Sequence, residues 1–287
     1  MSTSNEFKSD RKTAWCPGCG NFAILKTLQE ALAEMGLSPG EVAVVSGIGQ
    51  SGKLPHYMKC HTFNGLHGRT LPVATGLALS NHDMRVLAVA GDGDCYGEGG
   101  NHLLHAIRRN INVTLLVHNN QIYGLTKGQA SPTSLPELPS KTQPFGNPSE
   151  PLNPLALAIA MNCGFVARGF AGGEGLPDLK ELIKKAVNHP GFALVDIFQN
   201  CITFNRINTV KWYKEHTYFL EEEYEPGDRQ TAFQRALENG EKLPLGLFYH
   251  STERSAMAEK IPVLGSKPLI DQPFNREEAL AEIGEFG

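Results

Sequence analysis

The stretch "VLAVAGDGD", residues 86–94, decides the fold, because an apolar run ends abruptly in two carboxylates separated by a glycine. A continuous apolar run of this length predicts a strand buried on both faces of a parallel sheet. Asp92 and Asp94 then leave the strand at its carboxyl end, the edge where open parallel sheets bind ligands. The alternative is an ordinary junction between strand and helix, in which one aspartate only caps the helix.

Segments on both sides of this stretch alternate between strand and helix patterns. Apolar, β-branched runs predict strands over residues 41–49, 85–91, 112–120, 164–170 and 191–199. Apolar residues at helical spacing predict helices over residues 21–35, 70–81, 99–110, 152–162 and 176–189. Such alternation indicates an α/β fold, a mostly parallel sheet with helices on both faces.

The pattern changes after residue 200, where charges become frequent and the periodicity becomes weak. A segment of this kind is typical of an arm that packs on a larger body. We therefore expect one α/β domain over residues 1–200, followed by a C-terminal extension over residues 201–287. The extension is expected to pack on the domain or on a partner subunit.

The composition argues against several classes of protein. The 287 residues are 41% hydrophobic and carry a formal net charge of −4, so no basic excess exists to neutralise nucleic-acid phosphates. The polar start lacks the apolar core of a signal peptide, and no apolar run approaches the roughly 20 residues that span a bilayer. We therefore expect a cytoplasmic protein without nucleic-acid or membrane partners. In that reducing compartment the six cysteines are expected to serve metal or catalytic chemistry rather than disulfides.

A second glycine motif, "GIGQSG" at residues 47–52, matches the dinucleotide-binding pattern G-x-G-x-x-G. That pattern also needs a helix at its third glycine and an acidic residue about 20 positions later. Pro55 falls in the first turns of that helix, and no Asp or Glu occurs between Glu41 and Asp83. We therefore predict that the chain binds no nicotinamide dinucleotide, although the glycines indicate a close approach of backbone to something.

The predicted strand that follows Asp92 in the sequence, residues 112–120, ends in Asn119 and Asn120. Two adjoining strand ends would thus offer a carboxylate and a side-chain amide. Both are oxygen ligands that suit Mg²⁺, which usually also keeps phosphate oxygens of its substrate. Gly91 and Gly93 allow main-chain N–H groups to approach a diphosphate. Together these features predict a Mg²⁺–diphosphate site at the carboxyl edge of the sheet.

The pairing of GDG with a double asparagine resembles the thiamine-diphosphate signature of the pyruvate-decarboxylase and transketolase superfamily. From Trp15 to Cys201 the chain is more closely similar to the β subunits of 2-oxoacid:ferredoxin oxidoreductases. The similarity lies in "SGIG", "LPHY", "HGRTLPVATG", "GDGD", "GGNHLLHAIRRNIN" and "NNQIYGLTKGQ". This resemblance implies that Asp92, Asn120 and the main-chain carbonyl of Ile122 hold Mg²⁺. It also implies contacts with thiamine diphosphate by a further set of residues: Ile48, Gly49, His67, Gly91, Gly93, Asp94, Gly124, Leu125 and Thr126.

Cys16 and Cys19 in "WCPGCG" have C-x-x-C spacing, the start of a Zn²⁺ or iron–sulfur site. A redox dithiol is the alternative, but thioredoxin-like motifs follow a strand and this one follows a polar leader. Cys201 follows the last predicted strand and is a further candidate ligand. Cys95 follows the diphosphate turn, and Cys163 lies in an apolar helix, where a cysteine is more often a small hydrophobe.

The family resemblance implies a [4Fe–4S] cluster held by the C-x-x-C pair and two distant cysteines. The last of these matches Cys201, whereas the third normally ends a "GIGC" motif, and Gln50 occupies that position here. Cys60 is the nearby cysteine that could replace it. The expected ligand set is therefore Cys16, Cys19, Cys60 and Cys201.

The resemblance also implies coenzyme A-dependent oxidative decarboxylation of a 2-oxoacid, 2-oxoglutarate first and pyruvate next, with the carboxylating reverse reaction permitted. Electrons would pass through the cluster to ferredoxin. His67, Lys53 and Arg69 are the candidate catalytic residues. The two cations would bind a substrate carboxylate or a coenzyme A phosphate; solvated surface cations are the alternative. Because one α/β domain does not supply the glutamate that activates thiamine, we expect an α subunit with the pyrimidine-side domain, in a hetero-oligomer.

Two alternatives use the same motifs differently. A non-redox thiamine-diphosphate 2-oxoacid decarboxylase subunit shares the GDG and NN motifs but needs no cysteine cluster. A scaffold subunit stabilised by Zn²⁺ needs the cysteines but no thiamine diphosphate. Iron content, visible absorbance and cofactor analysis distinguish the three hypotheses.

Overall fold

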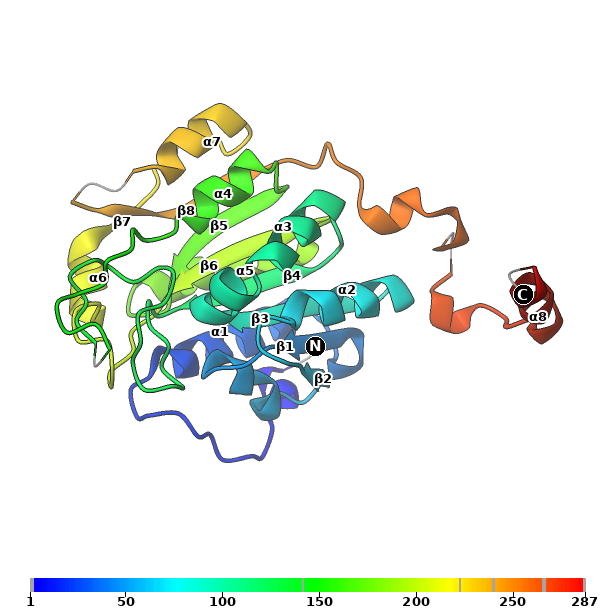
Figure 1. Ribbon diagram of the computed structural model, residues 1–287, viewed down its shortest axis with the longest axis horizontal. Coiled ribbons are helices and arrows are strands. Elements are labelled where there is room, and N and C mark those ends of the chain that lie inside the picture. The colour runs from blue at the N-terminus through cyan, green and yellow to red at the C-terminus, as the bar shows by residue number, and fades with distance from the viewer. Residues whose placement is uncertain (1–2, 141, 222, 239–240, 265–266, 286–287) are drawn as a thin grey trace.

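An eight-stranded sheet between two layers of helices forms the body of the protein (Figure 1). The computed structural model describes residues 3–140, 142–221, 223–238, 241–264 and 267–285. The strands are β1 (Val42–Ser46), β2 (His61–Asn64), β3 (Arg85–Gly91), β4 (Thr114–Asn119), β5 (Phe165–Phe170), β6 (Ala193–Phe198), β7 (Thr217–Phe219) and β8 (Leu243–His250). The α-helices are α1 (Gly20–Glu34), α2 (Thr70–Ser80), α3 (Gly100–Arg109), α4 (Pro154–Ala160), α5 (Gly175–Asn188), α6 (Val210–His216), α7 (Arg229–Ala236) and α8 (Arg276–Gly284).

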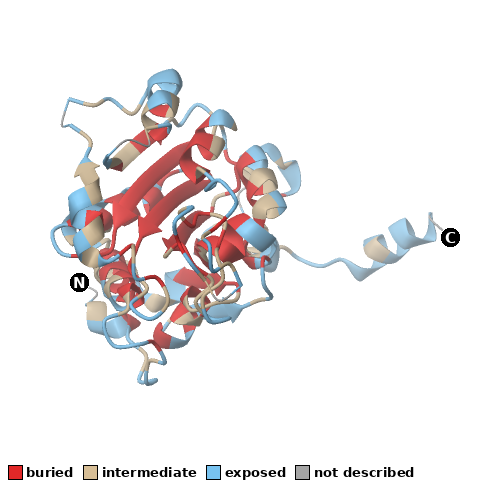
Figure 2. Ribbon diagram, turned by 60° about the vertical axis from the view of Figure 1, so that its left-hand side comes forward, coloured by how far each residue is buried: buried red, intermediate tan, exposed pale blue. Residues whose placement is uncertain are grey.

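The strand order is β2-β1-β3-β4-β6-β5-β8-β7, and every described pairing is parallel except that of β5 with β8. Side chains alternate along each strand, so β3 sends Val86 and Ala88 to one face and Leu87 and Val89 to the other. Residues of α2, α3, α4 and α7 pack on the first face, and residues of α1 and α5 pack on the second. Figure 2 shows the buried strands between these layers. This arrangement confirms the predicted α/β fold.

The strands are apolar on both faces because both faces are covered. Leu87, Val89, Leu115 and Leu116 are each no more than 1% exposed. Full burial of one large aliphatic side chain contributes roughly 1.5–3 kcal/mol, so the sheet interior is the main source of stability. That interior also fixes where the strands end, and therefore where the polar residues that follow them lie.

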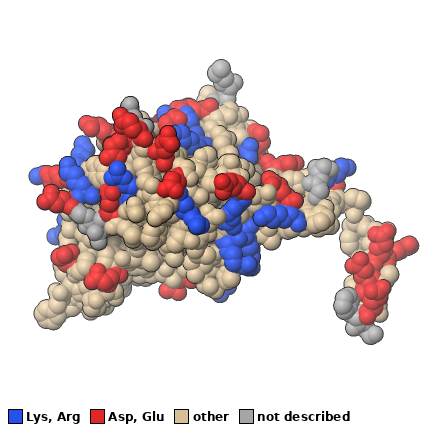
Figure 3. All heavy atoms as spheres, turned by 90° about the horizontal axis from the view of Figure 1, so that it is seen from above, with Lys and Arg blue, Asp and Glu red and all other residues tan. Residues whose placement is uncertain are grey.

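Two segments of the expected extension belong to the sheet itself. β8 pairs antiparallel with β5, β7 pairs with β8, and α7 packs against α4. By contrast, α8 projects away from the body in both ribbon views (Figures 1 and 2), and none of its described residues is buried. Acidic side chains, among them Glu277 and Glu278, gather on this projecting helix (Figure 3). The domain boundary at residue 200 stays a prediction.

The GIGQSG loop leads into a short 3₁₀ helix, η3 (Ser51–Tyr57), with Pro55 inside it, and not into an α-helix. Its glycines serve close backbone contacts instead. A Cβ at Gly47 would overlap the Asp94 carboxylate, and Gly49 has a φ of +122°, which side chains disfavour. Among the described helices, none combines the length and the hydropathy that a bilayer crossing requires.

Candidate active site

The carboxyl edge of the parallel strands gathers the polar residues that the sequence singled out. Asp92 follows β3 and begins a single π-helical turn, η4 (Gly93–Glu98), where its side chain is 1% exposed. Its Oδ2 accepts a 2.8 Å hydrogen bond from Thr133 Oγ1, and the same hydroxyl lies 2.8 Å from Asn119 Oδ1. One hydroxyl proton therefore faces two acceptor oxygens. These oxygen atoms, together with the negative charge of Asp92, suit a hard cation such as Mg²⁺.

A second buried carboxylate lies beside the first, but it has a partner. Asp196 on β6 accepts hydrogen bonds from Arg168 Nε at 3.2 Å, Tyr96 OH at 2.8 Å and Asn119 Nδ2 at 3.1 Å. Arg168 lies on the neighbouring strand β5, directly opposite Asp196, and its guanidinium stacks on the Phe198 ring at 4.6 Å. Arg168 therefore compensates the charge of Asp196.

Asp92 has no such cation among its described partners. Burial raises the pKa of Asp92 to about 6, hydrogen bonds from Ser131 and Thr133 oppose the shift, and the charge of Asp196 adds to it. The raised pKa indicates a carboxylate that is costly to ionise in the metal-free protein. A bound divalent cation would remove that cost, so the residues present fit the expected Mg²⁺.

The chain reverses sharply after β4, at the other half of the expected metal site. Asn120 Oδ1 accepts a 3.1 Å hydrogen bond from the Ile122 amide, and Asn205 Nδ2 donates to the Asn120 carbonyl at 3.1 Å. Between them, Gln121 has a φ of +56°, a left-handed conformation that costs a residue with a side chain of order 1–3 kcal/mol. The structure thus brings the three expected magnesium ligands, Asp92, Asn120 and Ile122, to the adjoining ends of β3 and β4.

Glycines let the two strand ends approach each other. A Cβ at Gly93 or at Gly97 would overlap the Tyr123 side chain, whose hydroxyl donates to the Gly93 carbonyl at 3.2 Å. A Cβ at Gly91 would lie 3.1 Å from Ser51 Oγ. The loop after Tyr123 contains the remaining expected diphosphate contacts, Gly124, Leu125 and Thr126, of which the last two are exposed.

The Asp94 carboxylate accepts hydrogen bonds from four groups of the surrounding chain. Its Oδ1 accepts hydrogen bonds from the Ile48 amide at 3.0 Å, the Gly68 amide at 2.8 Å and His67 Nδ1 at 2.6 Å, and its Oδ2 accepts one from Thr70 Oγ1 at 3.0 Å. The carboxylate is therefore occupied by its own chain. It connects the GIG loop to the loop that begins α2, and it orients the His67 ring.

The three expected catalytic residues make different contacts in the structure. His67 is partly exposed and meets the Tyr123 ring edge-on at 6.3 Å. Lys53 Nζ lies 3.5 Å from the Ala14 carbonyl, close to the C-x-x-C motif. Arg69 is exposed at the start of α2 and faces α3. On α3 the pKa of His102 is lowered, chiefly by burial and secondly by the positive charge of Arg69.

Three of the four expected cluster ligands lie in one region, although among the described residues no group of three or more His, Cys, Asp or Glu side chains is arranged so that it could hold a metal ion. Burial raises the pKa of Cys19 to about 11, with Cys201 and Cys16 adding to the shift and Lys53 opposing it. Thr203 Oγ1 lies 3.2 Å from Cys16 Sγ, so the segment after β6 packs on the C-x-x-C loop. This group of Cys16, Cys19 and Cys201 is called the cysteine triad below.

Cys60 does not join the triad. It directly precedes β2, whose first residue, His61, pairs with Ala43 at the amino end of β1. Its thiol contacts the His61 carbonyl at 3.4 Å, and burial raises its pKa to about 12. The expectation that Cys60 replaces the missing ligand is corrected here, because η3 leads the chain to the opposite edge of the sheet. Gln50 is near Cys201 instead: a Cβ at Gly124 would lie 3.7 Å from Gln50 Cγ and 3.9 Å from Cys201 Sγ.

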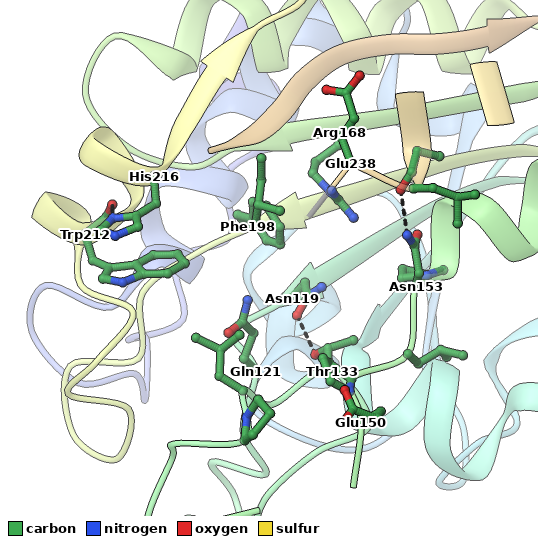
Figure 4. Close-up of a pocket in the computed structure, with 18 of the residues that line it drawn as sticks. Asn119, Gln121, Thr133, Glu150, Asn153, Arg168, Phe198, Trp212, His216 and Glu238 are labelled. Atoms are coloured by element: carbon green, nitrogen blue, oxygen red, sulfur yellow. Dashed lines mark hydrogen bonds between the residues drawn. The ribbon is translucent and has the colours of Figure 1, made fainter. Parts of the chain in front are cut away.

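A cavity of about 460 Å³ adjoins the carboxylate network and was not expected from the sequence. Asn119, Thr133 and Arg168 line its floor, and the stacked rings of Trp212 and His216 form one wall (Figure 4). The polar floor has a signal in the sequence. An arginine and an aspartate interrupt two apolar strands, "GFVARGF" and "GFALVDIFQ". Opposite charges that are buried in a covered sheet are expected to form an ion pair, because an unpaired buried charge is strongly destabilising.

Comparison with known proteins matches this geometry to a family. A model of the C-terminal thiamine pyrophosphate-binding domain of thiamine pyrophosphate enzymes matches residues 42–197. A model of the C-terminal part of pyruvate ferredoxin oxidoreductase β subunits matches residues 201–266.

Named relatives and a solved structure agree with these two models. Subunit beta of 2-oxoacid:ferredoxin oxidoreductase 2 from Aeropyrum pernix is 43% identical over 267 residues, which cover 89% of this chain and 86% of that one. Subunit KorB of 2-oxoglutarate oxidoreductase from Mycobacterium tuberculosis is 46% identical over 200 residues, 70% of this chain and 53% of that one. A structure of 2-oxoglutarate:ferredoxin oxidoreductase from Magnetococcus marinus, with 2-oxoglutarate, coenzyme A and succinyl-CoA bound, superposes with a TM-score of 0.89 at 38% identity, over 97% of this chain and 95% of that one. The chain therefore belongs to the β subunits of the 2-oxoacid:ferredoxin oxidoreductases, and its core is a thiamine pyrophosphate-binding domain.

Proposed function

We propose that this β subunit holds the diphosphate of thiamine diphosphate at the carboxyl edge of β3 and β4, through Mg²⁺ bound by Asp92, Asn120 and the Ile122 carbonyl. The observation that carries the proposal is the contrast between two buried carboxylates. Arg168 pairs with Asp196, whereas Asp92 has no cation and its pKa is raised to about 6. A carboxylate buried in this way at a strand end supports a bound metal ion.

The proposed reaction is the coenzyme A-dependent oxidative decarboxylation of a 2-oxoacid to an acyl-CoA and carbon dioxide, reversible to carboxylation. We favour 2-oxoglutarate because relatives at 38–46% identity include 2-oxoglutarate oxidoreductases, one of them with 2-oxoglutarate and coenzyme A bound. Pyruvate is the next candidate substrate. When bound, thiamine diphosphate supplies a nucleophilic carbon and an electron sink for this chemistry.

The residues of this chain bind and orient. Asp92 and Asn120 hold the metal, and Gly93 lets main-chain groups approach the diphosphate. Asp94 positions Ile48 and Gly49 in the loop that would contact the rings of the cofactor. The remaining expected contacts, on the loop after Tyr123 and beside Ser51, complete the cradle: Gly91, Gly124, Leu125 and Thr126.

His67 is proposed to hold or move a proton at the substrate side of the site. Asp94 Oδ1 contacts its Nδ1 at 2.6 Å, which fixes the ring and leaves Nε2 as the nitrogen for that role. Lys53 is proposed to stabilise charge at the cysteine triad, since it already lowers the pKa of Cys19. Arg69 is proposed to bind an anionic group of the substrate or of coenzyme A from the exposed start of α2.

The cysteine triad is proposed to hold a [4Fe–4S] cluster that passes electrons to ferredoxin. Three thiols at the surface edge of the site fit the soft iron of such a cluster. The partner α subunit is proposed to supply the pyrimidine-side domain and the activating glutamate. The matched family domain over residues 42–197 is the C-terminal thiamine pyrophosphate domain, which supports a second domain on another chain.

The end of the C-terminal extension is proposed to pack on that partner. Ile270, Phe274 and Ile283 are 63%, 80% and 67% exposed. Ile283 lies on the projecting helix α8 and Phe274 shortly before it, whereas Ile270 lies in a short 3₁₀ helix, Leu269–Asp271, that contacts α2. Large apolar side chains on a projecting segment indicate a surface that is covered in the assembled enzyme. We further propose that the assembled enzyme works in the cytoplasm.

Calorimetry of Mg²⁺-dependent thiamine diphosphate binding to the α–β complex tests the metal site. Asp92→Ala is expected to abolish binding and leave the circular dichroism spectrum unchanged, and Asn120→Ala is expected to weaken binding strongly. Asp83→Ala, an exposed aspartate beyond the end of α2, is the matched control and should bind as the wild type does. Wild-type affinity in Asp92→Ala would overturn the assignment. Ferredoxin reduction with 2-oxoglutarate, compared with pyruvate, then tests the substrate.

A further inference from the structure

The cysteine triad has three thiols, and a [4Fe–4S] cluster normally takes four ligands. All six cysteines lie in the described part of the chain, and the other three are elsewhere. Cys60 lies at the amino end of β2, whereas Cys95 and Cys163 are buried in the core between the sheet and the layer of α2, α3 and α4. The fourth ligand must therefore be something other than a cysteine of this chain.

Gln50 lies near the triad, on the side of Cys201. A Cβ built at Gly124 would contact both Gln50 Cγ, at 3.7 Å, and Cys201 Sγ, at 3.9 Å, so both side chains lie close to the same glycine. Trp15, next to Cys16 in the sequence, donates from Nε1 to the Gln50 carbonyl at 2.7 Å. This hydrogen bond fixes the backbone of Gln50 beside the C-x-x-C motif.

The side-chain oxygen of Gln50 has no partner of its own. Oε1 is buried and makes no hydrogen bond within the described residues. Buried polar atoms are almost always satisfied, because leaving one unpaired costs the full price of its desolvation. An unpartnered buried oxygen, on a side chain that lies near Cys201, indicates a group that can take a ligand.

We propose that Gln50 Oε1 is the fourth ligand of the cluster, bound to the iron that the cysteine triad leaves open. The inference rests on the proposed function, since it assumes that the cluster forms there. A neutral amide oxygen is a harder and weaker ligand for iron than a thiolate. The iron next to Gln50 is therefore exchangeable, and the cluster carries one negative charge less than a four-thiolate cluster does. A less negative cluster has a higher reduction potential.

The exchangeable iron gives a spectroscopic test on the α–β complex. Ferricyanide takes one electron from the resting cluster, which then releases Fe²⁺: [4Fe–4S]²⁺ becomes [3Fe–4S]⁺, Fe²⁺ and one electron. In the wild type we expect the EPR signal of an oxidised three-iron cluster together with one released Fe²⁺ per β subunit, captured by a chelator. In Gln50→Cys we expect the four irons to be retained under the same treatment, with a lower reduction potential. In Gln50→Ala we expect faster loss of iron than in the wild type.

Cys60→Ser is the control, because it removes a thiol that the structure separates from the triad. It should match the wild type in iron content, EPR signal and rate of iron release. Loss of the cluster in Cys60→Ser, or iron release from Gln50→Cys at the wild-type rate, would overturn the assignment to Gln50. A wild-type complex that contains no iron would instead overturn the proposed cluster itself, and thiamine diphosphate binding in each variant shows whether the subunit is folded.

Discussion

Two buried aspartates, one at the end of β3 and one on β6, two strands separated by β4, have opposite roles in this site. Asp196 is a structural anion, held by Arg168, Tyr96 and Asn119 in the middle of the sheet. Asp92, at the end of β3, has no cationic partner among the described residues and is available to bind a ligand. The difference lies in the partners and not in burial, since both side chains are no more than 1% exposed.

The buried pair gives the first prediction. Arg168→Leu leaves Asp196 as an uncompensated buried charge, so we expect the free energy of unfolding to fall by about 3–5 kcal/mol. Arg168→Leu combined with Asp196→Asn should recover part of that loss, because the isolated charge is gone. Urea unfolding followed by circular dichroism measures both. Lys211→Leu, which removes an exposed cation paired with the exposed Glu215, is the control and should change the midpoint little.

A glycine at the diphosphate turn gives the second prediction. Gly93→Ala forces the Tyr123 ring to move, and overpacking of this kind costs about 1–3 kcal/mol. We expect the affinity for thiamine diphosphate to fall about tenfold or more, because the displaced loop carries the proposed diphosphate contacts. Gly100→Ala is the matched control, since a Cβ there meets nothing within 4 Å. Equal affinities of the two variants in calorimetry would contradict the packing argument.

At the scale of elements, the end of α5 and the end of β8 meet at two histidines. His189 caps α5 and is 4% exposed, and its ring lies 5.4 Å from that of His250 on β8. Both ring nitrogens of His189 lack hydrogen-bond partners within the described residues. The pKa of His189 is lowered to about 4, chiefly because the ring is buried and secondly because of the charge of the nearby His250.

This contact predicts a pH dependence of stability. The fold favours neutral His189, so its contribution is complete above the ordinary pKa of 6.5 and is lost as the pH falls from there toward 4. Removing the group in His189→Gln should therefore reduce the drop in melting temperature between pH 7 and pH 5. The exposed His61→Gln on β2 is the control and should show the wild-type drop. An unchanged drop in His189→Gln would show that other groups cause it.

The sequence predicted those elements that a local pattern of apolar residues is enough to identify. Apolar runs predicted the five central strands, because strands covered on both faces contain little else. β8 was missed, since Pro244 and Gly246 interrupt its pattern, and the four-residue edge strand β2 was missed because its side chains are all exposed. The order of the strands depends on how helices pack across the sheet, which no local pattern encodes.

In the site, too, local motifs predicted some residues, whereas others depend on contacts between distant segments. The GDGD and NN motifs predicted where Asp92 and Asn120 lie, because both follow strands with a clear pattern. The partnership of Arg168 with Asp196 needed the register of β5 against β6. Cys60 was assigned to the wrong edge of the sheet because sequence spacing limits how far a chain can reach but not which way it turns.

At the scale of the whole molecule, the projecting C-terminal segment gives the last prediction. A chain ending at residue 272 keeps all eight strands of the sheet and the contact of the 3₁₀ helix Leu269–Asp271 with α2, so we expect its circular dichroism and its unfolding midpoint to match those of the full chain. Its association with the α subunit should weaken, because the exposed apolar residues of the segment are gone. Analytical ultracentrifugation measures the association. The paired substitution Phe274→Ser and Ile283→Ser should give the same loss, and full association of both variants would contradict the proposed contact.

Both edges of the sheet are closed by short strands, β2 with four residues and β7 with three. A further copy of the chain that added itself to either edge would gain few backbone hydrogen bonds. Long unpaired edges are the templates on which proteins polymerise into fibrils, and short ones give such growth little support. The fold therefore directs assembly away from the sheet and toward side-chain surfaces, where recognition can distinguish a proper partner from another copy of the same chain.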